Sequence, residues 1–542
     1  MARPIAAPAY FQSAPGRCSH SRTRVERLAQ FVCGARWQDV SEPAREQLKL
    51  RVLDSLGVAL GALDGEPVAM VREQVREFGG APLATLIGAG RSAPDRAAFY
   101  NGALVRYLNF NDSFLAPGET CHPSDNLAPV LAACEYAHAD GRTLLSALAV
   151  AYQVECRLCE VAPVRAKGFD HTTQGAYAVA AGVARALGLD ERRAANAIAI
   201  AGTSLNALRV TRTGELSHWK GLAYPATAFA ATHAAFLAMR GVTGPREVFE
   251  GNKGFMQAIS GPFEIDWPHE DLESVRRTIL KKYNAEIHSQ SAIEALLELR
   301  AEHNLDAAKV QQIELDTFQV AYDIIGGGEE GDKHRVASKE EADHSLPYLL
   351  AVALLDGQLL PEQYLPERIV AEDVQQLLRR VKVHPDPELS RRFPGEHCAR
   401  VRLRLRDGTV LEREQHDYEG FHTRPMTWDT VAGKFDRLAA PHLESETRAR
   451  IRDAVGDLDS LQVDELTHLL GTSVLQPERR HDDQRLTTDR SDGSCIVASR
   501  AASCATRPAR SPWSLTTLTS GDNPRARPTA ASYPRRQRAV TQ

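Results

Sequence analysis

The chain has 542 residues, of which 43% are apolar and 25% are charged. This composition excludes collagen-like, disulfide-scaffold and wholly disordered proteins, and the length predicts two large domains or three to four smaller ones. The formal charge of -5 argues against DNA as a partner. No run of 18 apolar residues occurs in the sequence, so no membrane span is expected.

The charge is divided unevenly along the chain. Residues 481–542 contain 10 Arg and 5 Asp, for +5, and residues 1–480 therefore carry -10. The C-terminal segment also has 16 Ser or Thr and few large apolar side chains, so residues 476–542 are predicted to be a disordered basic tail. We favour a solvated tail over a nucleic-acid arm, because its arginines are diluted by Pro, Ser and Thr.

Residues 1–23 are predicted to be a loose leader, since Pro4, Pro8 and Pro15 would break the amphipathic helix of a targeting signal. The nine cysteines are an odd number scattered over the chain, which is typical of proteins whose thiols stay reduced. A cytoplasmic location is therefore expected.

A helical segment is expected to begin near Arg24. Ser41 followed two residues later by Pro43 is a typical helix start, because the hydroxyl caps free amides and Pro is tolerated in the first turn. Several later segments are rich in Ala and Gly on more than one face, which allows close helix packing. We therefore predict a large all-α domain from residues 24–275 and 425–475, with helices at 44–63, 94–108, 126–139, 143–160, 174–188, 191–206, 223–240, 246–249, 428–438 and 445–456.

The pattern changes after about residue 275. In residues 399–406, Val401, Leu403 and Leu405 alternate with four arginines, which predicts a half-buried strand. Asp407-Gly408 follows as a hairpin turn, since Gly tolerates a positive φ. Residues 276–424 are therefore predicted to form a smaller α+β domain, with strands also at 309–318 and 379–384 and helices at 290–302, 345–356 and 372–378.

Several nucleotide and metal signatures are missing from the sequence. It contains no G-x-x-x-x-G-K-[ST] loop and no strand followed by G-x-G-x-x-G, and residues 326–328, all Gly, precede Glu329 and Glu330, whose charge would repel a phosphate. Cys156 and Cys159 share one helical stretch with no second pair nearby, so buried thiols are favoured over a metal or redox site. Neither a cofactor nor a metal is expected.

Five polar clusters lie against apolar or small-residue helices. Each has a structural explanation, since Ser124, Asp343 or Ser345 would cap the helix that follows and single basic residues are commonly solvated. Clusters that precede helix N-termini, taken together, indicate an electropositive pocket for a carboxylate-rich ligand, and their side chains suit acid–base chemistry. The clusters are 109–114 with 122–126, 167–173, Arg209 and Arg212 with 217–221, 281–291, and 342–348.

In this order and spacing, the clusters resemble the MmgE/PrpD family over roughly residues 24–470. The resemblance implies a large helical domain, a smaller α+β lid, an active site between them and a homodimer. It also implies chemistry without metal or organic cofactor, on a small tricarboxylate. From the charge and the lack of a long apolar run, neither a nucleic-acid nor a membrane partner is expected. The motifs that carry it are Asn111-Asp112 with His122-Pro123-Ser124, Trp219-Lys220-Gly221, Ala285-Glu286-Ile287-His288-Ser289-Gln290 and His344-Ser345-Leu346-Pro347-Tyr348.

One departure within these motifs favours a branch of the family. For decarboxylase-like members of the family, the resemblance implies a His at the position where this chain has Glu286. The residues around Glu286 instead resemble the dehydratase branch, which implies that His288 is the site residue of this motif. The expected function is a cofactor-independent dehydratase that acts on a 2-methylcitrate-like hydroxy-tricarboxylate. A decarboxylase or epimerase of the same family, or a non-catalytic carboxylate-binding relative, stays open as an alternative.

The resemblance also implies pocket residues, which fall on Asp112, His122, His171, Lys220, Lys281 and Tyr348. Dehydration needs cations for carboxylates, a base for a weakly acidic C–H and an acid for the departing hydroxyl. Lys220, Lys281 and Arg209 are the candidate carboxylate ligands, and His122 or His171 is the candidate base. Asp112 would orient or share the proton of that base, and Tyr348 or His288 would protonate the leaving oxygen.

Overall fold

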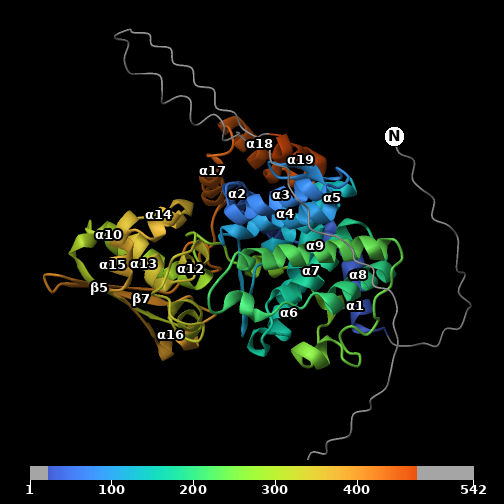
Figure 1. Cartoon of the computed structure of the whole chain (residues 1–542). Helices are drawn as coiled ribbons and strands as arrows, with labels where there is room; N and C mark the ends of the chain where they lie inside the picture. Colours follow the sequence, from blue (N-terminus) through green and yellow to red (C-terminus); the bar gives the residue numbers. More distant parts are fainter. Residues whose placement is uncertain (1–21, 473–542) are drawn as a thin grey trace, which may run out of the picture. The chain divides into compact units, whose positions relative to one another are not determined.

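The structure is a computed structural model that describes residues 22–472 (Figure 1). The predicted tail lies outside the described residues, and so does the predicted leader except for Arg22 and Thr23. Helices dominate the described part, and the sheets are small.

The first helical group is built around α9, which packs against α4, α7 and α8. Ser41 caps α2 by accepting a hydrogen bond from the backbone of Ala44 at 3.2 Å, which confirms the helix start predicted there. Figure 1 shows α17 beside α2, so a C-terminal helix returns to the N-terminal group. The helices are α1 (Arg24–Gly34), α2 (Glu42–Gly61), α3 (Glu66–Phe78), α4 (Pro94–Tyr107), α5 (Leu127–Tyr136), α6 (Gly141–Val161), α7 (Thr172–Ala186), α8 (Glu191–Ser204), α9 (Trp219–Met239), α17 (Trp428–Ala439), α18 (Ser445–Gly456) and α19 (Val463–Thr472).

The prediction that this group is all-α is wrong in two places. It contains two short antiparallel hairpins, β1 (Ala84–Leu86) with β2 (Gly90–Ser92) and β3 (Phe114–Ala116) with β4 (Glu119–Cys121). Strands of three residues are too short to show an alternating pattern. The helix predicted at 246–249 is instead a turn, because Pro245 and Gly251 leave too few residues to offset the cost of helix nucleation.

The second group is a four-stranded sheet covered by helices. Its strand order is β6-β5-β7-β8, with β5 parallel to β6 and antiparallel to β7. Val401, Leu403 and Leu405 of β7 point into the protein, whereas the arginines between them pair with acidic side chains, as the alternation predicted. The elements are β5 (Val310–Thr317), β6 (Val381–Pro385), β7 (Ala399–Leu405), β8 (Val410–Gln415), α10 (Gln290–Glu302), α11 (Gln319–Ala321), α12 (Lys339–Ala342), α13 (Leu346–Asp356), α14 (Pro366–Ile369), α15 (Glu372–Leu378) and α16 (Pro387–Arg392).

Each group has its own hydrophobic core. One core runs from Val25 to Leu280 and resumes from Met426 to Leu470, and the other lies between Ala285 and Leu405. The chain therefore passes from one core to the other just after Leu280. Residues at this passage lie close to both cores.

Helix α9 alone among the described helices is long and apolar enough to cross a membrane by length and composition. More than half of its most apolar stretch is buried inside the protein, where it packs on three other helices. Its apolar character is that of a core helix.

Close packing of the small-residue helices generates a prediction about Gly202. A Cβ atom added to Gly202 in α8 would lie 2.1 Å from the ring of Tyr177, which is itself stacked on Phe249 at 4.8 Å. We expect Gly202→Ala to lower the free energy of unfolding by about 1–3 kcal/mol, measured by urea denaturation. Gly433→Ala in α17, where a Cβ meets nothing within 4 Å, is the control and should stabilise by up to about 1 kcal/mol. Equal stabilisation by both variants would contradict the packing argument.

Candidate active site

A small cavity of about 40 Å³ lies where the two groups of elements meet. Its volume accommodates a few water molecules and is far below the roughly 300 Å³ of an ordinary ligand pocket. The first group contributes Arg106, Asn109, Glu119, Thr120, His122, Arg165, His171, Arg209 and Arg212, and the second contributes Glu286, His288, Ile324 and His344.

The β3–β4 hairpin positions the first of these side chains. The turn at Gly118 has a φ of 79°, which only Gly adopts at no steric cost, and β4 then leads directly into His122. Ser113 exchanges two backbone hydrogen bonds with Ile279, at 2.9 and 2.8 Å. This bridge fixes the hairpin beside the segment where the chain passes between the two cores.

His122 is held as a neutral base. Its Nδ1 donates to the backbone carbonyl of Asp112 at 2.7 Å, so the proton is on Nδ1 and the Nε2 lone pair is left for a ligand. Burial lowers the pKa of His122 well below its ordinary value, and Arg106 and Lys281 add to the effect. The backbone of Asp112, rather than its carboxylate, therefore orients this imidazole.

His171 lies opposite His122, with the ring centroids 5.4 Å apart and nearly perpendicular. Its Nδ1 is 3.4 Å from Asp170 Oδ1, and its buried Nε2 has no hydrogen-bond partner among the described residues. Arg212 donates to both oxygens of Asp170, at 2.9 and 3.3 Å. Although burial opposes it, Arg212, His171 and Arg209 lower the pKa of Asp170, so this carboxylate stays ionised behind the imidazole.

His344 is a third oriented imidazole, and the sequence motif had suggested its neighbour Tyr348 instead. Its Nδ1 donates to the Asp343 carboxylate at 2.6 Å. Asp343 also accepts from Lys220 and, at 2.7 Å, from Lys339. Burial and the Lys220 ammonium lower the pKa of His344 well below its ordinary value. The Asp-His dipeptide in the sequence was the signal that would have found it.

His288 and Glu286, from the second group of elements, also line the cavity. His288 stands against Phe318, Phe393 and His397, and neither ring nitrogen has a hydrogen-bond partner among the described residues. Burial lowers the pKa of His288 to about 3. Burial also raises the pKa of Glu286, although Lys281 opposes this. Glu286 is therefore biased towards a protonated carboxyl that faces the cavity.

Four arginines line the cavity, namely Arg106, Arg165, Arg209 and Arg212. Of these, Arg165 and Arg209 share the carboxylate of Glu330, at 3.4 and 2.7 Å. Glu330 is almost wholly buried and comes from the loop after residues 326–328. The structure thus contains one carboxylate already bound to the arginines of the cavity wall.

Four of the predicted site residues line the cavity, namely His122, His171, Arg209 and His288. The others lie behind it. Lys281 donates to the backbone and side-chain oxygens of Asn109, at 2.7 and 3.1 Å, and Lys220 reaches the cavity only through Asp343 and His344. The Asp112 carboxylate accepts from the Ser124 backbone and the Tyr152 hydroxyl.

Tyr348 is not brought to the cavity. Its hydroxyl donates to the carbonyl of Gln363, and the ring is wholly buried in the second core. Ser345 caps α13 by accepting a hydrogen bond from the Tyr348 backbone at 3.0 Å, so Tyr348 lies in the first turn of this helix. The Tyr348 side chain packs between α13 and the segment around Gln363. It is not positioned to protonate a leaving group in this arrangement.

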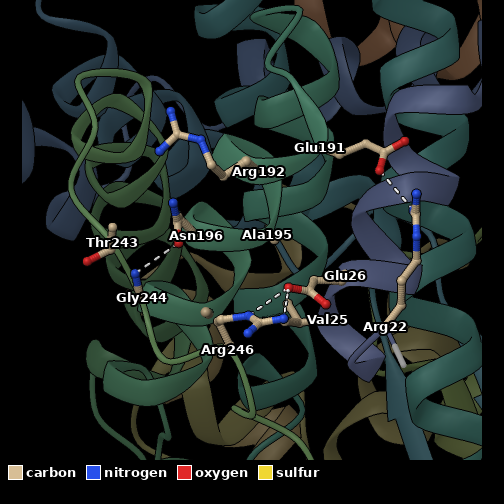
Figure 2. Close-up of a pocket in the computed structure, with 11 residues that line it drawn as sticks. Arg22, Val25, Glu26, Glu191, Arg192, Ala195, Asn196, Thr243, Gly244 and Arg246 are labelled. Atoms are coloured by element: carbon tan, nitrogen blue, oxygen red, sulfur yellow. Dashed lines mark hydrogen bonds and ion pairs between the residues drawn. The ribbon is translucent and has the colours of Figure 1, made fainter. Parts of the chain in front are cut away.

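A larger depression, of about 700 Å³, lies between α1, α8 and the loop after α9. Figure 2 shows two ion pairs among its charged side chains, Arg22 with Glu191 and Arg246 with Glu26. It has no convergent imidazoles or buried acids, so the small cavity is the better candidate for chemistry despite its size.

Buried acids behind the cavity form a hydrogen-bonded support. Glu155 accepts from Asn126 at 2.6 Å and from Tyr224 at 2.9 Å, and the Tyr224 ring lies 6.3 Å from that of His171. Burial raises the pKa of Glu155 to about 8, with the Asp125 carboxylate adding to the effect. Glu155 is therefore a neutral hydrogen-bonded acid at neutral pH.

The raised pKa of Glu155 makes stability depend on pH. The folded state keeps a proton that the unfolded chain releases above about pH 4.5, so this contribution to stability is present below pH 4.5 and is lost as the pH rises through about 8. Glu155→Gln cannot ionise, so its free energy of unfolding should rise relative to wild type by up to about 1.4 kcal/mol per pH unit in this range. Urea denaturation at pH 5.5 to 8 measures the difference, with exposed Glu77→Gln as the control. Parallel curves for Glu155→Gln and wild type would contradict the assignment.

The chain is similar to known proteins over most of its length. The MmgE/PrpD N-terminal domain model matches residues 26–268, and the C-terminal domain model matches residues 283–460. An alkylcitrate dehydratase from a fungal species is 29% identical over 469 residues, 78% of this chain and 89% of the relative.

Two further relatives have different names. A 2-methylcitrate dehydratase from Cupriavidus necator is 31% identical over 359 residues, which are 61% of this chain and 72% of the relative. A cis-aconitate decarboxylase from Mus musculus is 25% identical over 480 residues, which are 84% of this chain and 94% of the relative. With both domain models matched in order along most of its length, the chain belongs to the MmgE/PrpD family.

Proposed function

We propose that the protein is a lyase that dehydrates a citrate-like hydroxy-tricarboxylate, with 2-methylcitrate as the first candidate substrate. The observation that carries this proposal is the presence of three oriented imidazoles, His122, His171 and His344, around one arginine-lined cavity. The dehydratase relatives support the same reaction class. We also propose a cytoplasmic homodimer, in line with the sequence expectation.

We propose that the substrate binds to the two arginines that form ion pairs with Glu330. Arg165 and Arg209 hold its carboxylate, so they have the charge and geometry to bind a carboxylate of the substrate. The cavity of about 40 Å³ is small for a substrate, so we expect Glu330 and its loop to withdraw when a tricarboxylate enters. Ile324, the one aliphatic side chain among the lining residues, would contact an alkyl substituent.

The chemical steps follow from the protonation states. His122 Nε2 takes the proton from the carbon next to a carboxylate, and the electron pair forms the C=C bond as the C–O bond breaks. Glu286 gives its proton to the departing hydroxyl, which leaves as water. The arginines stabilise the negative charge that develops on the substrate carboxylate, and His171, 5.4 Å from His122, accepts the proton onward.

The reaction and the role of His122 are tested together. Purified protein should convert 2-methylcitrate or citrate to an unsaturated acid, seen as new ultraviolet absorbance, without added metal. His122→Gln should lower kcat by about 10²- to 10⁴-fold and leave thermal unfolding little changed. His233→Gln, at an exposed histidine on α9, is the control and should keep full activity.

Other outcomes of this assay would overturn the proposal. Release of carbon dioxide with cis-aconitate, in place of dehydration, would indicate a decarboxylase. Racemisation without a change in absorbance would indicate an epimerase, and ligand-induced stabilisation without product would indicate a binding protein. Activity lost with a chelator and restored by iron would contradict the cofactor-free mechanism.

The competition between Glu330 and the substrate is tested separately. Glu330→Gln keeps the size of the side chain but removes the charge that competes with the substrate for Arg165 and Arg209. We expect the KM to fall by about five- to tenfold, equivalent to about 1 kcal/mol, in steady-state assays. Glu329→Gln, at the exposed neighbouring position, should leave the KM unchanged. A higher KM for Glu330→Gln would mean that Glu330 assists binding.

A further inference from the structure

A cluster outside the cavity has the donor atoms of a transition-metal site. It lies at one end of the four-stranded sheet, where β7 begins and β8 ends. Glu396, Cys398 and His416 each offer one ligand atom there, and the three atoms lie within 4.8 Å of one another. Among the described residues, no other group of His, Cys, Asp or Glu meets this criterion.

The strand register builds the cluster. Ala399 of β7 pairs with Gln415 of β8, so the next pair outward is Cys398 with His416, and paired residues share one face of a sheet. His397 donates its backbone N–H to the His416 carbonyl at 2.8 Å, which continues the pairing. Glu396 lies at a bend two residues before Cys398, and its carboxylate accepts from the Cys398 thiol at 3.5 Å.

The distances between the donor atoms fit a tetrahedral ion. The Cys398 Sγ lies 3.5 Å from Glu396 Oε2 and 4.0 Å from His416 Nδ1, and His416 Nδ1 lies 3.3 Å from Glu396 Oε2. Zinc bonds of about 2.3 Å to sulfur and about 2.0 Å to nitrogen or oxygen place tetrahedral ligands roughly 3.3–3.5 Å apart. The ligands need to shift by no more than about half an ångström.

The guanidinium group of Arg392 lies beside two of the three proposed ligands, Glu396 and His416. The Arg392 guanidinium donates to Glu396 and to His416 Nδ1. The His416 lone pair and the Glu396 carboxylate are therefore turned towards one point. Arg392 also donates to Glu414 at 3.2 Å, so it has a carboxylate partner to keep when it leaves the cluster.

We propose that Glu396, Cys398 and His416 form a binding site for a zinc-like divalent ion, which replaces Arg392. The ion binds Glu396 oxygen, Cys398 sulfur and His416 Nδ1, and a water molecule completes the tetrahedron. The Cys398 thiol releases its proton to solvent on binding, and no electron is transferred. The site is separate from the proposed active site, so the dehydratase assignment does not depend on it.

Cobalt is the probe, because its bond to a thiolate gives a charge-transfer absorption band. The untagged full-length protein, kept reduced, should bind one Co²⁺ with such a band, and Zn²⁺ should displace it. Cys398→Ser should abolish the band, and His416→Ala, at a half-exposed position, should weaken binding at least tenfold. Cys33→Ser, at a partly buried cysteine in α1, is the matched control and should behave as wild type.

Substitution of Arg392 gives a more specific test of the proposed site. Arg392→Gln removes the competing cation, so it should tighten zinc binding several-fold in competition with a coloured chelator. Weaker binding by Arg392→Gln would overturn the proposal. It would also be overturned if Co²⁺ gave no thiolate band, or if the band persisted in Cys398→Ser. Circular dichroism of each variant identifies any loss of binding that comes from misfolding.

Discussion

The Asp343 carboxylate joins the two groups of elements at the cavity. It accepts from Lys220 of α9, from Lys339 of α12 and from the adjacent His344. Asp343, Lys220 and His344 are buried, whereas Lys339 is partly exposed. A buried ion pair is favourable only when its remaining hydrogen-bonding capacity is satisfied, and here three donors surround one carboxylate. Lys220 therefore connects the first core to the second and orients His344 at the same time. Removal of Asp343 would leave the buried Lys220 ammonium without its carboxylate at the junction.

The same principle extends around the cavity. Asp170 holds His171 and is held by Arg212, and Glu330 neutralises Arg165 and Arg209. The imidazoles that face the cavity are kept neutral by burial, while the carboxylates of Asp170 and Asp343 stay ionised beside them. An acidic chain thus builds a local site suited to anions, because the arginines converge on one cavity. Long-range repulsion from a net charge of -5 is screened by salt, whereas contacts inside the cavity are not.

Several features of the fold were predictable from residue patterns. The strand in residues 399–406, its hairpin and the helix start at Ser41 follow from alternation, turn chemistry and capping, which act over a few residues. The hairpins β1–β2 and β3–β4 were missed because three-residue strands carry no periodic signal. Their existence depends on tertiary contacts, such as the bridge between Ser113 and Ile279.

In the candidate site, too, some features follow from residue patterns and others depend on tertiary contacts. The sequence by itself determined most of the longer helices, the strands of the four-stranded sheet, the absence of nucleotide motifs and the polar clusters that identify the family. Only the tertiary structure decided which members of a cluster face the cavity, placing His344 there and Tyr348 in the core, and setting Lys220 and Lys281 behind the wall. These outcomes depend on partners more than 100 residues apart, such as Lys220 with Asp343 and Arg209 with Glu330. A motif names neighbours along the chain, but the direction and charge of a buried side chain are set by whatever packs against it.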